Sequence, residues 1–265
     1  MLQLEQPFKQ AWAHSDPYAE ILALQGETFR QVEARKTMRF DFAGESYFVK
    51  YHRGTALKEV LKNLITLRLP VLGAKNEWQA IEHLQAAAIP TMSCYGYGQR
   101  HWNPLQRESF IITKDLNPAI SLEDYCANWA TQPPAYRVKR HLIQQLARTV
   151  AAMHQSGLNH RDCYICHFLL ALPFDENRDN ATLSVIDLHR AQIRKKTPLR
   201  WRNKDLIALY YSSFPLALSF RDYCYFLTEY FGQPVRDIFR QESYLIRQAQ
   251  KRAEKIKQRT LRKNL

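Results

Sequence analysis

One short stretch decides how the rest of this chain is interpreted: His160-Arg161-Asp162-Cys163-Tyr164-Ile165-Cys166-His167-Phe168-Leu169-Leu170. Before it, residues 136–156 carry apolar side chains at helical spacing, and Gly157 is the residue type that commonly ends a helix. The stretch opens with three polar residues and closes on an apolar run that can form a strand. The predicted order is therefore helix, glycine, polar loop and strand.

This order is typical of the catalytic loop of a kinase, which carries the residues His-Arg-Asp. In such a loop the Asp accepts the proton of the attacking hydroxyl, and the residue five positions later lies beside a metal ion. Asp162 is then the candidate catalytic residue, and His167 occupies the later position. The tripeptide alone is also consistent with a solvated loop that contains an ion pair, so the rest of the chain has to decide.

The length and net charge of the chain restrict its domain organisation and the kinds of partner that it can bind. The 265 residues are enough for one domain in two lobes or for two small domains, and the formal net charge of +13 favours an anionic partner. Nucleic acid, an anionic membrane surface and a phosphorylated substrate all fit that charge. The first residues show no secretory signal, and no apolar stretch approaches the ~18 residues of a spanning helix. We therefore expect a cytoplasmic protein.

The cysteines raise two competing hypotheses. Residues 163–167 match the C-x-x-C-H pattern of covalent haem attachment, and with His160 they could also be interpreted as a zinc site. Covalent haem normally accompanies export, which the start of the chain does not indicate. One short motif also competes with a pattern that extends over the whole chain. We expect the five cysteines to be free thiols, with neither haem nor zinc.

The N-terminal half predicts a small lobe built on antiparallel strands. We interpret residues 1–20 as an extension with room for one short helix, and residues 21–116 as the lobe, with a strand opening at 21–24. Residues 38–42 alternate apolar and polar side chains, a turn follows at 43–46, and a second strand returns at 47–51.

Two charged residues of this lobe fit a nucleotide site. A kinase needs a Lys late in such a strand to hold the α- and β-phosphates of ATP, and a Glu on the following helix to pair with it. Lys50 and Glu77 have these positions. Both also have ordinary interpretations, as a solvated strand Lys and as a first-turn Glu favoured by the helix dipole. Residues 113–116, at the exit of a buried strand, would bind adenine through the backbone, with Thr113 and Leu116 as candidates.

The segment between Lys50 and Glu77 is longer than a plain connection. Residues 57–65 predict an amphipathic helix with a basic edge, closed by Pro70. This insertion could face a substrate or a membrane, or simply pack on the core.

The C-terminal part, residues 117–265, predicts a larger and mainly helical lobe. Ser121 and Asp124 form a capping-box pattern that starts a helix, which prolines 133 and 134 would end. A strand at 182–188 carries Asp187, at the position where a kinase places its magnesium ligand. Residues 188–204 contain seven Lys and Arg and no acid, and a helix starts at Asp205.

Lys50, Glu77, Asp162 and Asp187 occur in the order of a protein-kinase-like fold. Residues 48–54, 69–78, 110–113, 160–170 and 186–190 together resemble the lipopolysaccharide core heptose(I) kinases of Gram-negative bacteria. The resemblance covers nearly the whole chain. It implies an α+β kinase-like fold, the use of ATP and Mg²⁺, and phosphorylation of the first heptose of the inner core. It also implies work at the cytoplasmic face of the inner membrane, no nucleic-acid partner, and a role for Asp205 in bracing the catalytic loop.

Three departures from protein kinases qualify this resemblance. No G-x-G-x-x-G precedes Lys50, so residues 29–37 would cover the phosphates with charged side chains: Arg30, Arg35 and Lys36. His167 replaces the usual Asn, and imidazole is a poor magnesium ligand, so Asp187 would hold the metal while His167 could contact phosphate instead. The segment after Asp187 is short and lacks A-P-E, so we do not expect regulation by loop phosphorylation.

Two classes of function remain at this point. The first is a kinase for a glycolipid sugar, with another sugar or aminoglycoside kinase as the nearest alternative; the basic run after Asp187 favours an acceptor that is already anionic. The second is a pseudokinase or basic nucleic-acid-binding module, which the unusual His167 and the missing glycine loop would favour.

The C-terminal run predicts a membrane contact. Apolar residues at 246, 249, 253 and 256 form a narrow stripe beside a basic face. Its hydrophobicity is too low for deep insertion, so attachment would be electrostatic and reversible.

Overall fold

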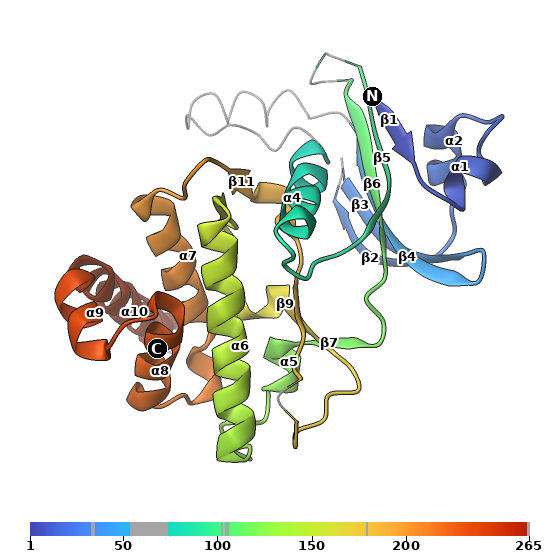
Figure 1. Cartoon of the computed structure of the whole chain (residues 1–265). Helices are drawn as coiled ribbons and strands as arrows, with labels where there is room; N and C mark the ends of the chain where they lie inside the picture. Colours follow the sequence, from blue (N-terminus) through green and yellow to red (C-terminus); the bar gives the residue numbers. More distant parts are fainter. Residues whose placement is uncertain (33–34, 54–73, 102, 104–105, 179, 264–265) are drawn as a thin grey trace. The chain divides into compact units, whose positions relative to one another are not determined.

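The computed structural model describes residues 1–32, 35–53, 74–101, 103, 106–178 and 180–263 (Figure 1). Two compact units make up the chain. The first unit contains Met1–His83, Met92–Asn117 and Asp187–Arg190, and the second contains Leu84–Thr91, Pro118–Ile186 and Ala191–Leu265. This division differs from a simple cut at residue 116, because Asp187–Arg190 returns to the first unit.

The first unit is built on a six-stranded antiparallel sheet with the order β1-β5-β6-β4-β3-β2. The predicted hairpin is confirmed as β3 and β4. Its turn residues Ala43 and Gly44 have φ values of 50° and 80°, the left-handed geometry that two-residue hairpins favour. The strands are β1 (Leu2–Leu4), β2 (Glu27–Val32), β3 (Arg35–Phe42), β4 (Glu45–Arg53), β5 (Cys94–Arg100) and β6 (Glu108–Lys114).

Helices cover both faces of this sheet. Figure 1 shows α1 (Phe8–Ala11) and α2 (Pro17–Ala23) on one face and α4 (Lys75–Ala86) on the other. Phe8 is fully buried, and its ring lies 4.7 Å from that of Phe42 and 4.9 Å from that of Tyr47. Truncation of such a ring to Ala typically costs about 3–5 kcal/mol. The first two helices therefore complete the core of this unit.

The prediction for the N-terminal residues was wrong in two respects. Residues 1–20 are no extension, since β1 pairs with β5 and α1 packs into the core. Residues 21–23, expected to open a strand, end α2 instead. Asp16 caps this helix by accepting from the Tyr18 N–H, and Pro17 occupies its first position, a strong combination of start signals.

Two other expected segments need comment. Residues 29–37, interpreted as a phosphate-covering loop, lie largely in the paired strands β2 and β3. The predicted helix at 57–65 lies outside the described residues.

The second unit is mainly helical. Figure 1 shows α6 (Tyr136–Gln155) running along it, with α7 (Leu199–Ser212) and α8 (Phe220–Phe231) on one side and α5 (Leu122–Tyr125) and β9 (Phe168–Ala171) on the other. The predicted stripe of Leu142, Leu146, Val150 and Met153 on α6 is buried. The remaining elements are β7 (Ala119–Ser121), β8 (Leu158–Asn159), η1 (Ile165–His167), β10 (Leu183–Val185), β11 (Gln192–Ile193), η3 (Phe214–Leu216), α9 (Val235–Gln241) and α10 (Ser243–Lys263). The predicted α+β architecture is thus confirmed.

Helix boundaries in this unit differ from expectation. Ser121 caps α5 as predicted, accepting from the Asp124 N–H at 3.0 Å, but the helix ends at Tyr125 and does not reach the two prolines. α7 begins at Leu199, directly after Pro198, so Asp205 lies inside the helix and does not start it. β10 ends two residues before Asp187.

Candidate active site

Strand alternation determines where Lys50 points. Its neighbours Val49 and Tyr51 are buried in the aromatic core beneath α1 and α2. Successive side chains of a strand point to opposite faces, so Lys50 lies on the face that α4 covers. There its Nζ donates to Glu77 Oε1 at 2.7 Å and to Asp187 Oδ1 at 2.8 Å. The structure thus brings together three residues predicted from sequence.

Lys50 lies between two carboxylates, one of them deeply buried. The side chain of Glu77 is 1 % exposed, that of Lys50 24 % and that of Asp187 33 %. Burial alone would favour neutral Lys50, but the charges of Glu77 and Asp187 raise the pKa of Lys50 above its usual value. A carboxylate as deeply buried as Glu77 depends on such a partner, because an unpaired buried charge is costly.

Asp187 has a second partner that the sequence interpretation missed. Burial opposes the ionisation of Asp187, but a hydrogen bond from His189 and the charge of Lys50 outweigh it and hold the pKa of Asp187 well below its usual value. His189 Nδ1 lies 2.9 Å from Asp187 Oδ1. The only signal in the sequence is a His two positions after the predicted metal ligand. We call Lys50, Glu77, Asp187 and His189 the ion-pair site.

Further positive charge lies at the same end of β3 and β4. Arg35 pairs with His52 across these strands. Burial, together with the charges of Arg35, Lys50 and His189, lowers the pKa of His52 to about 3, so this ring is neutral at physiological pH.

Thr113 is buried in β6, and Leu116 is half-buried two residues beyond the end of that strand.

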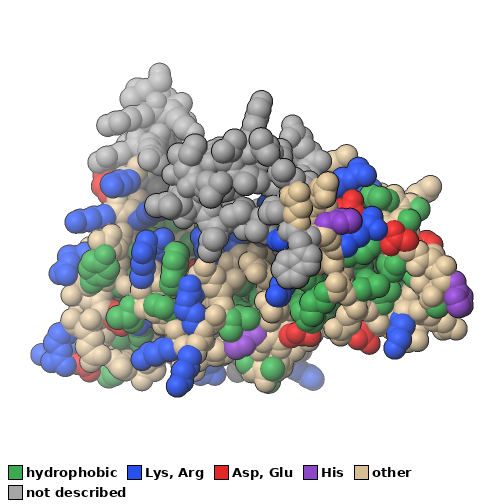
Figure 2. All heavy atoms as spheres, turned by 90° about the horizontal axis from the view of Figure 1, so that it is seen from above, with side chains coloured by type: hydrophobic (Ala, Val, Ile, Leu, Met, Phe, Trp, Pro, Cys, Tyr) green, Lys and Arg blue, Asp and Glu red, His purple; other side chains and the backbone are tan. Residues whose placement is uncertain are grey.

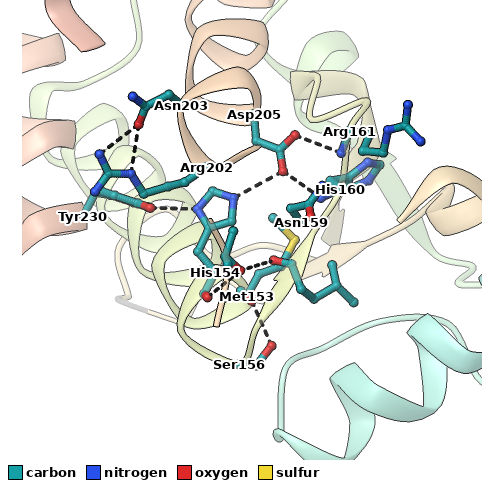
Figure 3. A network of polar contacts seen from close by, with 12 residues as sticks. Met153, His154, Ser156, Asn159, His160, Arg161, Arg202, Asn203, Asp205 and Tyr230 are labelled. Atoms are coloured by element: carbon teal, nitrogen blue, oxygen red, sulfur yellow. Dashed lines mark hydrogen bonds and ion pairs between the residues drawn. The ribbon is translucent and has the colours of Figure 1, made fainter. Parts of the chain in front are cut away.

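In the second unit, a buried carboxylate fixes the backbone next to Asp162. Asp205 accepts from the His160 N–H at 2.6 Å and from the Arg161 N–H at 2.8 Å (Figure 3). Its side chain is only 1 % exposed. Arg161 has a φ of 72°, in the left-handed region that non-glycine residues seldom adopt. Such backbone conformations persist where their surroundings enforce them, and here Asp205 does so.

The same carboxylate is held from behind by two side chains that the sequence interpretation missed. His154 Nε2 lies 3.2 Å from Asp205 Oδ2, and His154 Nδ1 lies 2.7 Å from the Tyr230 hydroxyl (Figure 3). A carboxylate only accepts, so Nε2 is the donor. Residues of three helices, α6, α7 and α8, therefore form one buried polar chain that ends on the predicted catalytic loop.

His167 makes its contact within the loop. Its Nδ1 lies 2.7 Å from the backbone oxygen of Asp162, so Nδ1 carries the proton, since a carbonyl oxygen only accepts. Its ring stacks on that of His160, with ring centres 5.4 Å apart and planes at 6°. His160 Nε2 in turn lies 2.9 Å from the backbone oxygen of Ile186, the residue before Asp187.

The chain that carries these two groups of residues is similar to known proteins. A sequence model described as "Lipopolysaccharide kinase (Kdo/WaaP) family" matches residues 19–230. The chain belongs to this family. It is 55 % identical to the lipopolysaccharide core heptose(I) kinase WaaP of Escherichia coli over 100 % of both chains. It is 48 % identical to WaaP of Pseudomonas aeruginosa over 98 % of this chain and 97 % of that one.

A solved structure supports the same family. The chain resembles WaaP in complex with acyl carrier protein with a TM-score of 0.84 and 45 % identity, covering 96 % of this chain and 98 % of that one. The predicted resemblance and the kinase-like α+β fold are thereby confirmed. Among the described residues, no helix is long and apolar enough to cross a bilayer.

The ion-pair site fits a magnesium ion that binds together with phosphate. Within the described ranges, no three His, Cys, Asp or Glu side chains form a group that could hold a metal on their own. Magnesium, however, usually keeps several waters and binds through one or two carboxylates plus the phosphates of the substrate. Asp187, whose pKa lies well below its usual value, would supply one such carboxylate.

Cys163 of the C-x-x-C-H motif is a fully buried free thiol. Burial raises the pKa of Cys163 well above its usual value, whereas zinc binds the thiolate. Burial likewise raises the pKa of Cys94 and of Cys126 to about 12. In the part of the chain that the structure describes, the cysteines form no disulfide.

Proposed function

We propose that this protein transfers the γ-phosphoryl group of ATP to a hydroxyl of the first heptose of the lipopolysaccharide core. The names of its full-length relatives support this substrate. The observation that carries the proposal is the ion pair of Lys50 with both Glu77 and Asp187, because kinases need this Lys–Glu pair and this Asp to bind nucleotide and metal.

The residues of the first unit would bind the nucleotide. Lys50, oriented by Glu77, contacts the α- and β-phosphates, and the exposed Arg35 adds positive charge for the phosphates. Backbone groups from Thr113 to Leu116 pair with adenine. Asp187 would hold Mg²⁺, which supplies positive charge to neutralise the phosphate oxygens.

The catalytic loop of the second unit would carry the proton. The heptose oxygen attacks the γ-phosphorus in line with the bond to the β–γ bridging oxygen, which breaks as ADP leaves. Asp162 accepts the proton of the attacking hydroxyl. Asp205 keeps the backbone before Asp162 in place through the His160 and Arg161 N–H groups.

A transfer assay tests this proposal. Purified protein, γ-labelled ATP, Mg²⁺ and core lipopolysaccharide without heptose phosphate should give a labelled core, and Asp162→Ala should not. Labelling of an aminoglycoside or a free sugar alone would favour another sugar kinase. ATP binding without any transfer, or salt-sensitive RNA binding, would favour a pseudokinase or a binding module.

We further infer work at the cytoplasmic face of the inner membrane. The acceptor is a glycolipid, and α10 carries exposed basic side chains at Lys251, Arg252 and Lys255. Figure 2 shows many Lys and Arg side chains and few Asp or Glu at the left of the view, where α7, α9 and α10 lie in Figure 1. Anionic lipid attracts such residues.

An acyl carrier protein is a second partner that we propose, because the similar WaaP structure was solved in complex with one. The second unit contains an almost wholly apolar cavity of about 230 Å³ between α6, α7, α8 and α10, and a hydrocarbon chain is the part of an acylated carrier that such a cavity fits. Its lining includes Leu142, Leu206, Phe226, Leu245 and Ala249.

A cavity-filling substitution tests this partner. Ala249→Phe should block the cavity and remove binding of an acylated carrier, while any binding of the carrier without an acyl chain should not change. Ala253→Phe is the matched control, since Ala253 lies one turn further along α10 and is not part of the lining. Equal binding of acylated carrier by both variants would show that the acyl chain binds outside this cavity.

A further inference from the structure

A tryptophan beside the catalytic loop is surrounded by cations. Trp201 lies in the first turn of α7, and four positively charged groups lie within 6 Å of the centre of its ring. The distances are 5.3 Å for Arg161 Cζ, 5.9 Å for Arg194 Cζ, 5.2 Å for Arg200 Cζ and 4.4 Å for Lys204 Nζ. We call these five residues the Trp201 cluster; all belong to the second unit.

The catalytic loop itself positions two members of the cluster. Arg161 directly precedes Asp162, and its left-handed backbone is held by Asp205. Arg194 donates to Asn159 Oδ1 and to Gln192 Oε1, both at 2.8 Å. The Arg194 guanidinium is therefore fixed against Asn159, three residues before the proposed proton acceptor, and the Arg161 backbone is fixed directly next to that acceptor.

A glycine lets Arg194 reach this position. The Arg194 N–H donates to the Gly157 carbonyl at 3.0 Å, and Gly157 has a φ of 92°. A Cβ on Gly157 would lie 1.9 Å from the backbone oxygen of Arg194, far inside contact distance. Gly157 thus does more than end α6, because it admits the segment that carries Arg194 against the start of the catalytic loop.

The cluster concentrates like charge. Cations over an indole gain about 0.5–1 kcal/mol each at exposed sites, but they repel one another. The surrounding segment, residues 188–204, contributes no acidic side chain. Arg200 and Lys204 are exposed, while Trp201, Arg161 and Arg194 are half-buried. Such an arrangement favours an anion that enters from solvent.

We propose that the Trp201 cluster binds the carboxylate of an acidic sugar next to the heptose that receives the phosphate. Guanidinium groups bind carboxylates through paired hydrogen bonds, with a direction that a single ammonium lacks. In protein kinases, Arg side chains pair with a phosphate on the activation loop. Only eight residues separate η2 (Leu188–Arg190) from α7, without an A-P-E motif, and here the anion comes with the acceptor. This inference rests on the proposed function.

The test compares two soluble acceptors with four proteins. The acceptors are deacylated core oligosaccharide without heptose phosphate, in its native form and after chemical reduction of its carboxyl groups. The proteins are the unchanged chain, Arg200→Gln with Lys204→Gln, Arg194→Lys, and a control. The control, Lys195→Gln with Lys196→Gln, removes the same charge from two exposed residues of the same segment that lie outside the cluster. Deacylated acceptor excludes any contribution from lipid headgroups.

We expect the Arg200/Lys204 variant to raise KM for the native acceptor about ten-fold or more, the usual loss for hydrogen bonds to a charged group. Its KM for ATP should not change, and it should match the unchanged protein on the reduced acceptor. Arg194→Lys should show a smaller loss of the same kind, and the control should behave like the unchanged protein. An equal rise of KM for both acceptors, no rise at all, or a defect seen only with lipid vesicles would overturn the inference.

Binding measured without ATP separates this inference from the proposed function. Calorimetric titration of the native and reduced oligosaccharides should show the same dependence on the carboxylate and on the cluster. Carboxylate-dependent binding without phosphate transfer would refute the proposed function and keep the subsite. Transfer that does not depend on the carboxylate would keep the function and refute the subsite.

Discussion

The ion-pair site and the Asp205 network beside the predicted catalytic loop each hold a carboxylate in place, but with different kinds of partner. In the first unit, Asp187 is held by two side chains, Lys50 and His189, which end in charged or ionisable groups. In the second unit, Asp205 is held mainly by backbone N–H groups, and it fixes the loop that carries Asp162. The ion-pair site thus balances the charge of Asp187, whereas the contacts of Asp205 fix the backbone geometry of the loop.

This difference predicts different consequences for ligands. Lys50 and Asp187 are partly exposed, and under the proposed function they would exchange partners as phosphate and metal bind. Asp205 is buried and keeps its partners, since a buried carboxylate that loses a hydrogen-bond donor becomes costly. Substitutions in the ion-pair site should therefore alter nucleotide affinity, and substitutions around the loop should alter the rate of the chemical step.

Asp162→Ala should have the largest effect of all. Removal of a general base typically lowers the rate by about 10²–10⁴-fold. Asp162 lies in a loop and is half-buried, so the thermal unfolding midpoint should change little. Initial rates at saturating ATP and acceptor, together with ATP affinity by calorimetry, test this prediction.

The isosteric variant Asp162→Asn serves as its control, because it keeps shape and loses proton acceptance. Near-normal turnover in either variant would remove Asp162 from the mechanism. A loss of ATP affinity as large as the loss of rate would erase the distinction between the two sites.

Lys50→Met should have the second-largest effect on activity, and that effect should come from weaker binding of ATP. Loss of a hydrogen bond to a charged group costs about 1.5–3 kcal/mol, so ATP affinity should fall roughly 10- to 150-fold. The variant also leaves the buried Glu77 without its partner, which typically costs about 3–5 kcal/mol of stability.

A double variant separates these two effects. Lys50→Met with Glu77→Gln removes both charges, so the unfolding midpoint should recover while ATP affinity stays low. Recovery of both would show that Lys50 acts only through stability, and an unchanged affinity in the single variant would exclude Lys50 from the nucleotide site.

The sequence was most informative where chemistry follows a local pattern. Strand alternation around Lys50 and the position of Asp187 led to residues that the structure joins in one ion-paired group, and the order helix–glycine–loop led to the loop whose backbone Asp205 holds. His154, Tyr230 and Trp201 could not be found in this way. Their roles depend on which helices meet, and a His or Trp on an amphipathic helix has the same pattern whether it packs in a core or holds a carboxylate.

The helical boundaries were missed for a related reason. The acid Asp205 suggested a first-turn residue, but α7 begins earlier, after Pro198, and hydrogen bonds from the His160 and Arg161 N–H groups stabilise the buried Asp205 in the helix interior. The N-terminal residues suggested an extension because only the assembled sheet offers β5 as a partner for β1.

His167→Ala should have a moderate effect that is confined to the chemical step. The structure places Nδ1 against the Asp162 carbonyl, so its loss should loosen the loop by one hydrogen bond, about 1 kcal/mol or five-fold in kcat. His167→Asn keeps a donor and should lie between the Ala variant and the unchanged protein. KM for ATP and the magnesium dependence provide the comparison, since a change in either would show that imidazole contacts phosphate or metal. A complete loss of activity in the Asn variant would show that the ring itself takes part in the reaction.

Charge reversal on α10 should have the smallest effect on catalysis, because it concerns neither site. The predicted apolar stripe of this helix is not available to a membrane over its first turns: Leu245 is buried, and Ile246 and Ala249 line the apolar cavity. Among the side chains of α10 that the structure describes, the exposed basic ones are the candidates for attachment, so binding should be electrostatic, specific for vesicles that contain anionic lipid, and reversed by salt. At about 1 kcal/mol for each Lys near the surface, loss of one charge should weaken vesicle binding about five-fold, and Lys251→Glu with Lys255→Glu should weaken it further.

Lys9→Glu is the matched control, an exposed Lys of the first unit whose reversal changes the net charge by the same amount as Lys251→Glu. Sedimentation with neutral and anionic vesicles should separate the two single variants, while transfer to a deacylated acceptor should be the same for all. Equal weakening by Lys9→Glu would mean that net charge, and not α10, determines attachment, and equal binding to neutral vesicles would return α10 to an ordinary solvated helix.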